Sequence, residues 1–168
     1  MPHSTAFYPC CGSDVDEPRA MLSGIVDQII YCDINPIFSE RSVRQASTAE
    51  LPVIIRLNHE ALAAVSEVER IDVLFYRRDS TGEGGSGLFV IGDVFLRPLL
   101  AAHQSTLRLI ITDGSNSRGA NFKRMTRTTG LIKFGKHFKP ASLQPLLASH
   151  GLWMIDVTPL PRNSHPKT

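Results

Sequence analysis

Short apolar runs recur along the whole chain, and they constrain its fold more than any other feature of the sequence. The runs are rich in β-branched and aromatic residues, which favour strands. Several are continuous rather than alternating, which is the pattern of strands buried on both faces of a sheet. They are residues 5–9 (TAFYP), 28–34 (QIIYCDI), 52–57 (PVIIRL), 71–78 (IDVLFYRR), 108–113 (RLIITD), 130–134 (GLIKF) and 152–160 (LWMIDVTPL).

Patterns typical of helices lie between these runs. They are residues 16–26, 58–70, 88–103 and 140–151. In the second of them Asn58 is a good capping residue, and Leu62, Val65 and Val68 then fall on one face. Because strands and helices alternate, we predict an α/β fold: one three-layer domain over residues 1–160 with a mostly parallel central sheet.

Length and composition agree with one globular domain. The chain has 168 residues, of which 42% are apolar, enough to bury a sizeable core. Residues 161–168 are expected to form a flexible tail. No apolar run approaches the roughly 18 residues of a membrane span, and the N-terminal residues lack the pattern of a secretory signal. We therefore expect a cytoplasmic protein with no membrane partner and with reduced cysteines.

Ligands of such sheets bind at the carboxyl ends of the strands, so the turns after the strands are the places to search for a site. The first turn contains Gly12, which allows a tight turn and the close approach of a ligand. Asp33 ends the second strand, and an acid about 20 residues past the glycine commonly holds a ribose hydroxyl pair. The alternative is a tight turn with a helix cap at Asp14 or Asp16 and an ordinary turn acid at Asp33. An acid exposed at a strand end is expected to contribute little to folding.

The segments FYPCCGSD and IIYCDINP together resemble the first two motifs of Rossmann-like S-adenosylmethionine-dependent methyltransferases. The resemblance extends more loosely to LRLIITDGSN, as a late central strand, and to LWMIDVTPL, as a final one. It implies a Rossmann-like sheet, S-adenosylmethionine as the cofactor, and a ribose held by Asp33. The methionine part would be lined by the residues of the first turn: Cys11, Gly12, Ser13 and Asp14.

A second turn, DSTGEGGSG, follows the strand predicted at residues 71–78. Its glycines have G-x-G-x-x-G spacing, but Asp79, Ser80 and Thr81 separate them from the strand, whereas a dinucleotide-binding turn follows its strand directly. We therefore favour a flexible loop that covers a ligand, with a solvated loop or a separate dinucleotide site as alternatives. In the methyltransferase-like interpretation this strand end lies beside the transferable methyl group, so Asp79 and Ser80 would face the substrate.

A third turn follows the strand predicted at residues 108–113. Asp113 and Asn116 are small and polar, and they fall where a sheet of this kind keeps its active groove. Ordinary turn chemistry is the alternative. In the enzymatic interpretation Asp79 or Asp113 would orient the methyl acceptor, while Ser80 and Asn116 would bind it.

Charge is unevenly distributed along the chain. Residues 1–93 contain fourteen acids and seven Lys or Arg, whereas residues 94–168 contain two acids and eleven Lys or Arg. Residues 118–139 combine seven of these cations with three phenylalanines. Such a segment could bind a nucleic-acid strand, or a small anionic ligand or acidic partner, or it could face the acidic half of the chain. A solvated surface with its phenylalanines in the core is the fourth alternative.

Cys10, Cys11 and Cys32 are expected to approach one another because the first two strands are neighbours. Adjacent strand residues point to opposite faces, so Cys10 and Cys11 cannot easily bind one ion. The sequence also contains no C-x-x-C or H-x-x-x-H spacing. We therefore predict no metal site and small buried hydrophobic side chains, with a reactive thiol as the alternative.

Two functions remain open. The first is a small S-adenosylmethionine-dependent methyltransferase-like protein of unknown substrate. It is favoured because acids and glycines follow three of the predicted strands. The second is a non-catalytic Rossmann-like domain that binds a nucleotide, an anionic ligand or a protein partner. The second is favoured by the single glycine of the first motif, where the family usually has several spaced glycines.

Overall fold

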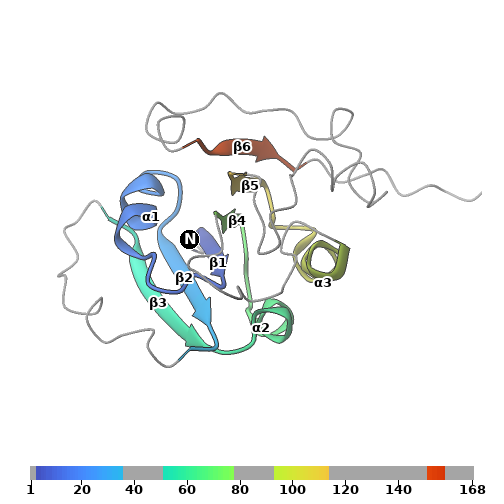
Figure 1. Ribbon diagram of the computed structural model, residues 1–168. Coiled ribbons are helices and arrows are strands. Elements are labelled where there is room, and N and C mark those ends of the chain that lie inside the picture. Colours follow the sequence, from blue (N-terminus) through green and yellow to red (C-terminus); the bar gives the residue numbers. More distant parts are fainter. Residues whose placement is uncertain (1–2, 36–50, 78–92, 114–150, 158–168) are drawn as a thin grey trace, which may run out of the picture.

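The computed structural model describes residues 3–35, 51–77, 93–113 and 151–157, which form an α/β fold around one sheet (Figure 1). The strand predicted at 130–134 and nearly all of the helix predicted at 140–151 lie outside the described residues. The elements are β1 (Thr5–Pro9), α1 (Asp16–Met21), β2 (Gln28–Asp33), β3 (Val53–Asn58), α2 (Ala61–Glu67), β4 (Val73–Tyr76), α3 (Asp93–His103), β5 (Leu109–Thr112) and β6 (Trp153–Asp156).

In the described part of the chain the sheet has six strands, in the order β3-β2-β1-β4-β5-β6. The first five are parallel, and β6 runs antiparallel to β5 at one edge. This arrangement confirms the predicted Rossmann-like α/β fold with a mostly parallel sheet. The chain builds outward from β1 to β3 and then crosses to β4, so the strand order reverses between β1 and β4. The carboxyl ends of these two strands therefore flank the topological switch point, where ligands of open α/β sheets bind.

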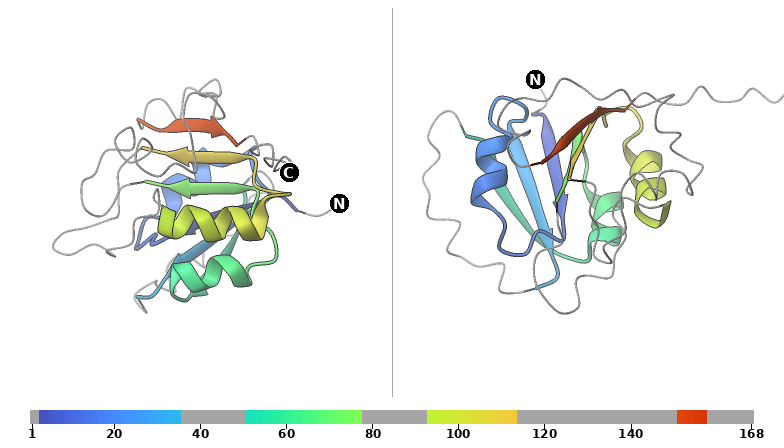
Figure 2. Two further views of the ribbon diagram at one scale, coloured as in Figure 1. Left: turned by 90° about the vertical axis from the view of Figure 1, so that its right-hand side faces the viewer. Right: turned by 45° about the horizontal axis from the view of Figure 1, so that its top comes forward.

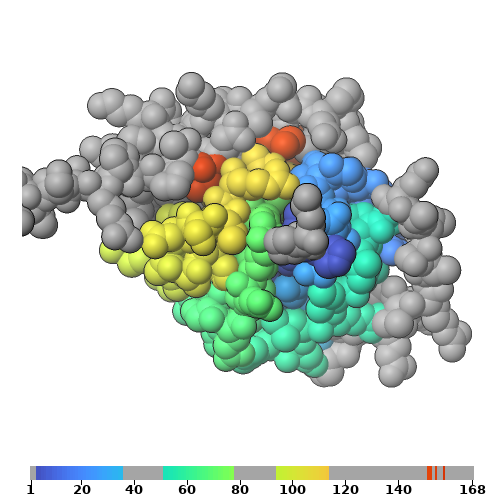
Figure 3. All heavy atoms as spheres, turned by 180° about the vertical axis from the view of Figure 1, so that it is seen from behind, coloured from blue at the N-terminus to red at the C-terminus, as the bar shows by residue number. Residues whose placement is uncertain are grey.

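Helices cover both faces of the sheet. α1 lies on one face, while α2 and α3 lie side by side on the other (Figure 2). Seen from behind, β3 (teal) and α3 (yellow) lie on opposite sides of the molecule, with the start of the chain between them (Figure 3). No helix in the described part of the chain is long and apolar enough to cross a membrane.

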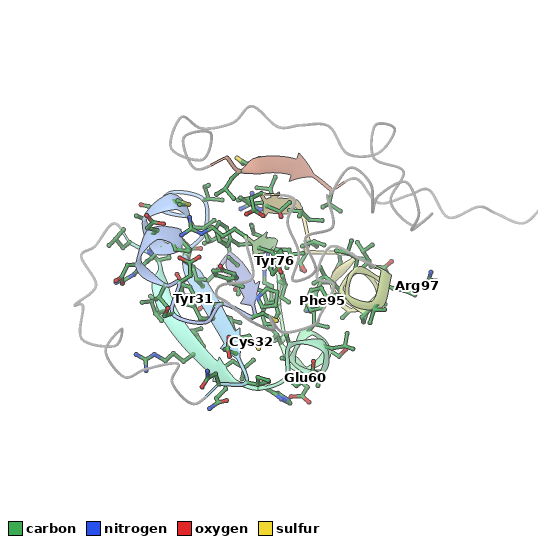
Figure 4. All side chains as sticks on the ribbon, in the orientation of Figure 1. Tyr31, Cys32, Glu60, Tyr76, Phe95 and Arg97 are labelled. Carbon is green, nitrogen blue, oxygen red and sulfur yellow. The ribbon has the colours of Figure 1, made fainter. Side chains whose placement is uncertain are left out.

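The two central strands, β1 and β4, are buried at every position, as their continuous apolar runs predict. Successive residues of β1 pack against opposite layers. Phe7 stacks on Phe95 of α3, with ring centroids 6.5 Å apart, and Phe95 points from α3 toward the sheet (Figure 4). Tyr8, the next residue, contacts the edge of the Phe75 ring of β4 at 4.9 Å, and its hydroxyl bonds to Asp14, just before α1. The core thus extends through the central strands to both helical layers.

Two helix boundaries differ from the sequence prediction. α1 ends at Met21 instead of continuing to residue 26, and Gly24 follows in the left-handed conformation with φ 74°. α2 is capped by Glu60, whose carboxylate accepts hydrogen bonds from the N–H groups of Leu62 and Ala63 at 3.0 and 2.8 Å. Asn58 is not the cap, because it is the last residue of β3 and pairs with Asp33 of β2.

A buried carboxylate holds the amino ends of the central strands together. Asp72, just before β4, accepts a hydrogen bond from the backbone N–H of Thr5 at 2.9 Å. It also accepts two from Arg70, from Nε at 2.8 Å and from Nη2 at 2.6 Å. Burial acts to raise the pKa of Asp72, but the hydrogen bonds from Arg70 and Thr5 outweigh it, so the pKa lies below its ordinary value.

We predict that Asp72→Asn lowers the free energy of unfolding by about 2–3 kcal/mol at neutral pH, since it weakens hydrogen bonds to a charged acceptor. Because the folded-state pKa is depressed, this stabilisation is complete above the ordinary carboxyl pKa of about 3.9. It is lost as the pH falls through the folded-state value. Urea denaturation should therefore show a gap between parent and variant that narrows in acid. A gap of constant size would contradict the assignment.

Candidate functional site

The first turn and the acid that ends β2 meet at the carboxyl edge of the sheet. The pairing of β1 with β2 continues beyond the strand, because the N–H of Cys11 donates to the carbonyl of Cys32 at 3.2 Å. The next N–H, that of Gly12, donates to Oδ2 of Asp33 at 2.8 Å. The two residues that the sequence selected for ligand binding are thus joined directly.

Asp33 is more firmly held than an exposed acid at a strand end. Its Oδ2 accepts from Gly12, and its Oδ1 accepts from the N–H of Asn35 at 2.7 Å. The residue itself is only half-buried. The premise that this acid is exposed is therefore wrong. Because removal of the carboxylate would leave a partly buried N–H without its acceptor, we expect Asp33 to contribute to folding.

The backbone of the turn is tightly coiled. Cys10 and Gly12 both have left-handed φ values, 55° and 54°. Glycine adopts this region freely, whereas Cys10 is strained there by roughly 1 kcal/mol. The N–H of Asp14 donates to the carbonyl of Cys11 at 3.0 Å and closes the turn. α1 begins after Val15, and neither Asp14 nor Asp16 caps it through a side-chain hydrogen bond.

Asp14 instead forms an ion pair across the switch point. Arg77, just after β4, donates to it from Nε at 2.7 Å and from Nη2 at 2.6 Å. The Tyr8 hydroxyl donates to Oδ2 of Asp14 at 2.7 Å. Burial, reinforced by the Asp14 charge, raises the pKa of Tyr8, and the hydrogen bond to Asp14 raises the pKa of Arg77. Both donors therefore keep their protons.

Arg77 also reaches the first turn of α1. Its Nη2 donates to Oε2 of Glu17 at 2.5 Å. The Arg77 and Asp14 side chains are 15% and 20% exposed, whereas that of Glu17 is 60% exposed. Because partly buried ion pairs are screened less than exposed ones, the contact with Asp14 is the stronger of the two. The sequence pattern did not identify Arg77, and its only local signal is the basic pair RR at the end of the strand.

The remaining predicted site residues are dispersed. Ser13 is exposed in the first turn, whereas the Cys11 side chain is buried in the core and could meet a ligand only through its backbone. Asp113 follows β5 at the same edge and is half-buried. Asp79, Ser80 and Asn116 lie outside the described residues, as do the glycine-rich turn and residues 118–139.

His59 also lies at this edge, although the sequence pattern did not identify it. Its N–H donates to the carbonyl of Asp33 at 3.1 Å and extends the β2–β3 pairing. Its Nδ1 accepts from the N–H of Glu60, so its Nε2 carries the proton that bonds Glu67 at 2.9 Å. Both ring nitrogens of His59 are therefore hydrogen-bonded to residues at the start and end of α2.

None of the three cysteines forms a disulfide, and two of them are inert because they are buried. Cys11 and Cys32 are buried, and the Cys32 thiol donates to the carbonyl of His59 at 3.3 Å. Burial raises the pKa of Cys11, and it raises the pKa of Cys32 to about 12. Cys10 is half-buried. Within the described ranges, no three His, Cys, Asp or Glu side chains are grouped as a metal ion would require.

No protein-family model and no curated protein sequence matches the chain. Solved structures do match. A proposed methyltransferase from Streptococcus mutans, in complex with SAH, has a TM-score of 0.56 and 14% identity over 92% of this chain and 89% of its own. A 16S rRNA methyltransferase, KamB, has a TM-score of 0.54 and 12% identity over 93% and 88%.

A spermidine synthase in complex with the transition-state analogue AdoDATO has a TM-score of 0.55 and 13% identity. It matches 92% of this chain, but the chain spans only about half (54%) of the synthase. At these identities the likeness establishes the fold. It agrees with the predicted Rossmann-like architecture of methyltransferase type.

We predict that iodoacetamide at about pH 8 labels the folded protein at Cys10 only, because a thiol must be both ionised and reachable to react. Cys11 and Cys32 are buried and have raised pKa values, so they should react only after unfolding. Intact-mass and peptide spectra, recorded with and without urea, would count and locate the labels. Labelling of Cys11 or Cys32 in the folded protein at the rate of the unfolded chain would contradict their placement.

Proposed function

We propose that this chain is a methyltransferase-like domain that binds S-adenosylmethionine, or a closely related nucleoside, across the carboxyl ends of β1 and β2. The hydrogen bond from the Gly12 N–H to Asp33 carries the proposal, because it joins the glycine of the first turn to the carboxylate that ends β2, beside the switch point. The likeness in fold to proteins that are solved with SAH or AdoDATO supports it.

The chemistry of Asp33 fits a ribose. Each carboxylate oxygen has two lone pairs, and each accepts one backbone N–H here. A lone pair on each oxygen remains to accept the 2′ and 3′ hydroxyls without loss of the hydrogen bonds from Gly12 and Asn35. Gly12 would leave room for the ligand, and Ser13 would offer an exposed hydroxyl.

The other members of the turn would serve the ligand indirectly. Asp14 is occupied by Arg77 and Tyr8, so it would hold the turn rather than contact the ligand. S-adenosylmethionine supplies an activated methyl group when bound. We propose that Asp113, at the end of β5, and Asp79 orient the acceptor of that group, and that Ser80 and Asn116 bind it.

A non-catalytic ligand-binding domain is the second candidate, and one observation favours it. The residue two positions before Gly12 has a left-handed φ, where glycine would be unstrained, yet it is a cysteine. Its side chain would narrow the approach of a ligand to the turn. Binding of a nucleotide without adenosylmethionine or its product would support this candidate.

We predict that S-adenosylmethionine or S-adenosylhomocysteine raises the thermal midpoint, because a ligand that binds only the folded state stabilises it. Asp33→Ala should then weaken binding about ten- to hundredfold, which corresponds to roughly 1.5–3 kcal/mol for hydrogen bonds to a charged group. Calorimetry would measure both affinities below the midpoint of the variant, since Asp33→Ala should also lose stability.

Asp27→Ala is the matched control for Asp33→Ala. Asp27 lies just before β2 and accepts the N–H of Ser4 at 2.8 Å, as Asp33 accepts that of Gly12 at the other end of the strand. It should lose stability and retain full affinity. Equal affinity of Asp33→Ala and the parent would refute a ribose role. No shift with any adenosyl compound or common nucleotide would refute the proposed function.

We predict that Gly12→Ala and Gly24→Ala each lower the free energy of unfolding by about 1–2 kcal/mol, because both residues have left-handed φ. Only Gly12→Ala should weaken ligand binding. Gly24 follows α1, and a Cβ there meets no atom within 4 Å, so its variant measures backbone strain alone. Urea denaturation and calorimetry on both variants would separate strain from ligand contact. Equal affinities would place the ligand away from Gly12.

A further inference from the structure

We infer that Arg77 is a positioning residue for the Gly12 turn, which it holds in its binding shape through Asp14. The inference rests on the proposed function for its ligand readout, whereas its effect on the turn can be measured without ligand. Nothing in the sequence motifs assigns a role to this arginine.

The turn is fixed at two points. On one side the N–H groups of Cys11 and Gly12 bond to β2. On the other side the Asp14 side chain bonds to Arg77 and Tyr8. Gly12 belongs to the first anchor and lies two residues before the second, so the direction of its N–H depends on both.

Arg77 is the stronger part of the second anchor. It supplies two hydrogen bonds in the planar, bidentate geometry that fixes a carboxylate in place, whereas Tyr8 supplies one. Arg77 also neutralises a carboxylate in a region where Glu17 and Asp33 add further negative charge. Without Arg77, Asp14 would keep a partly desolvated charge with one neutral donor. The carboxylate would then turn toward water, and residues 12–14 would follow it.

A second ion pair offers a matched control. Arg70 donates to Asp72 from Nε at 2.8 Å and from Nη2 at 2.6 Å, nearly the geometry of the Arg77–Asp14 pair. It lies just before β4, at the opposite edge of the sheet, whereas Arg77 lies just after the same strand. Arg70→Met and Arg77→Met therefore remove bidentate ion pairs of similar geometry from the two ends of β4. Only Arg77→Met also removes the contact with Glu17.

The test compares backbone amide exchange and ligand affinity in the two variants. Arg77→Met should speed exchange of the Gly12 amide by about tenfold, because local opening of the turn becomes easier. It should weaken the binding of S-adenosylhomocysteine by a similar factor. Arg70→Met should lower overall stability but leave the Gly12 amide and the affinity unchanged. Arg77→Lys, which keeps the charge without the bidentate fork, should recover part of both effects.

The outcomes distinguish failure of the positioning role of Arg77 from failure of the proposed ligand. If the Gly12 amide and the affinity respond alike to Arg77→Met and Arg70→Met, the arginine is merely structural and the inference fails. If the Gly12 amide responds selectively but the parent binds no S-adenosylhomocysteine, the positioning role stands and the proposed ligand does not. Glu17→Gln, which removes only the exposed contact of Arg77, should leave both readouts near parent values. A Glu17→Gln effect as large as that of Arg77→Met would also overturn the inference.

Discussion

The burial of β1 is the constraint on which the rest of the structure depends. A strand enclosed by two parallel neighbours and two helical layers leaves backbone N–H groups near its ends that must find acceptors. Three carboxylates at the ends of the neighbouring strands accept them. The pairs are Ser4 with Asp27, Thr5 with Asp72, and Gly12 with Asp33. Acids at strand ends are thus part of how this sheet is built.

The sequence predicts the centre of the fold well because burial leaves a direct record in composition. β1 and β4 are covered on both faces, so they contain continuous apolar runs that resemble no helical pattern. Gly12 and Asp33, both selected from the sequence, lie together because one strand–helix–strand unit brings the ends of two parallel strands together. The spacing between the two residues matches such a unit, and the direct bond between them follows from the β1–β2 register.

The remaining features depend on contacts that leave no local pattern. Arg77 and Asp14 are 63 positions apart, and they meet only because β1 and β4 are adjacent across the switch point. Asn58 is a suitable helix cap by residue type, yet the β2–β3 pairing extends to it and moves the cap to Glu60. In both cases the register of the sheet overrides the preference of the residue, and the register is not visible in a short segment of sequence.

Carboxylates accept hydrogen bonds at both edges of the sheet, but they differ in how many lone pairs remain for a ligand. Asp72 at the amino edge is buried and accepts three hydrogen bonds, two of them from a guanidinium, so little of it is available to anything else. Asp33 at the carboxyl edge is half-buried and accepts two, both from backbone groups. A carboxylate that uses only some of its lone pairs to stabilise the fold can accept hydrogen bonds from a ligand with the others. The neighbouring Asp14 differs, because Arg77 and Tyr8 bond to both of its oxygens. It therefore shapes the turn instead of binding a ligand.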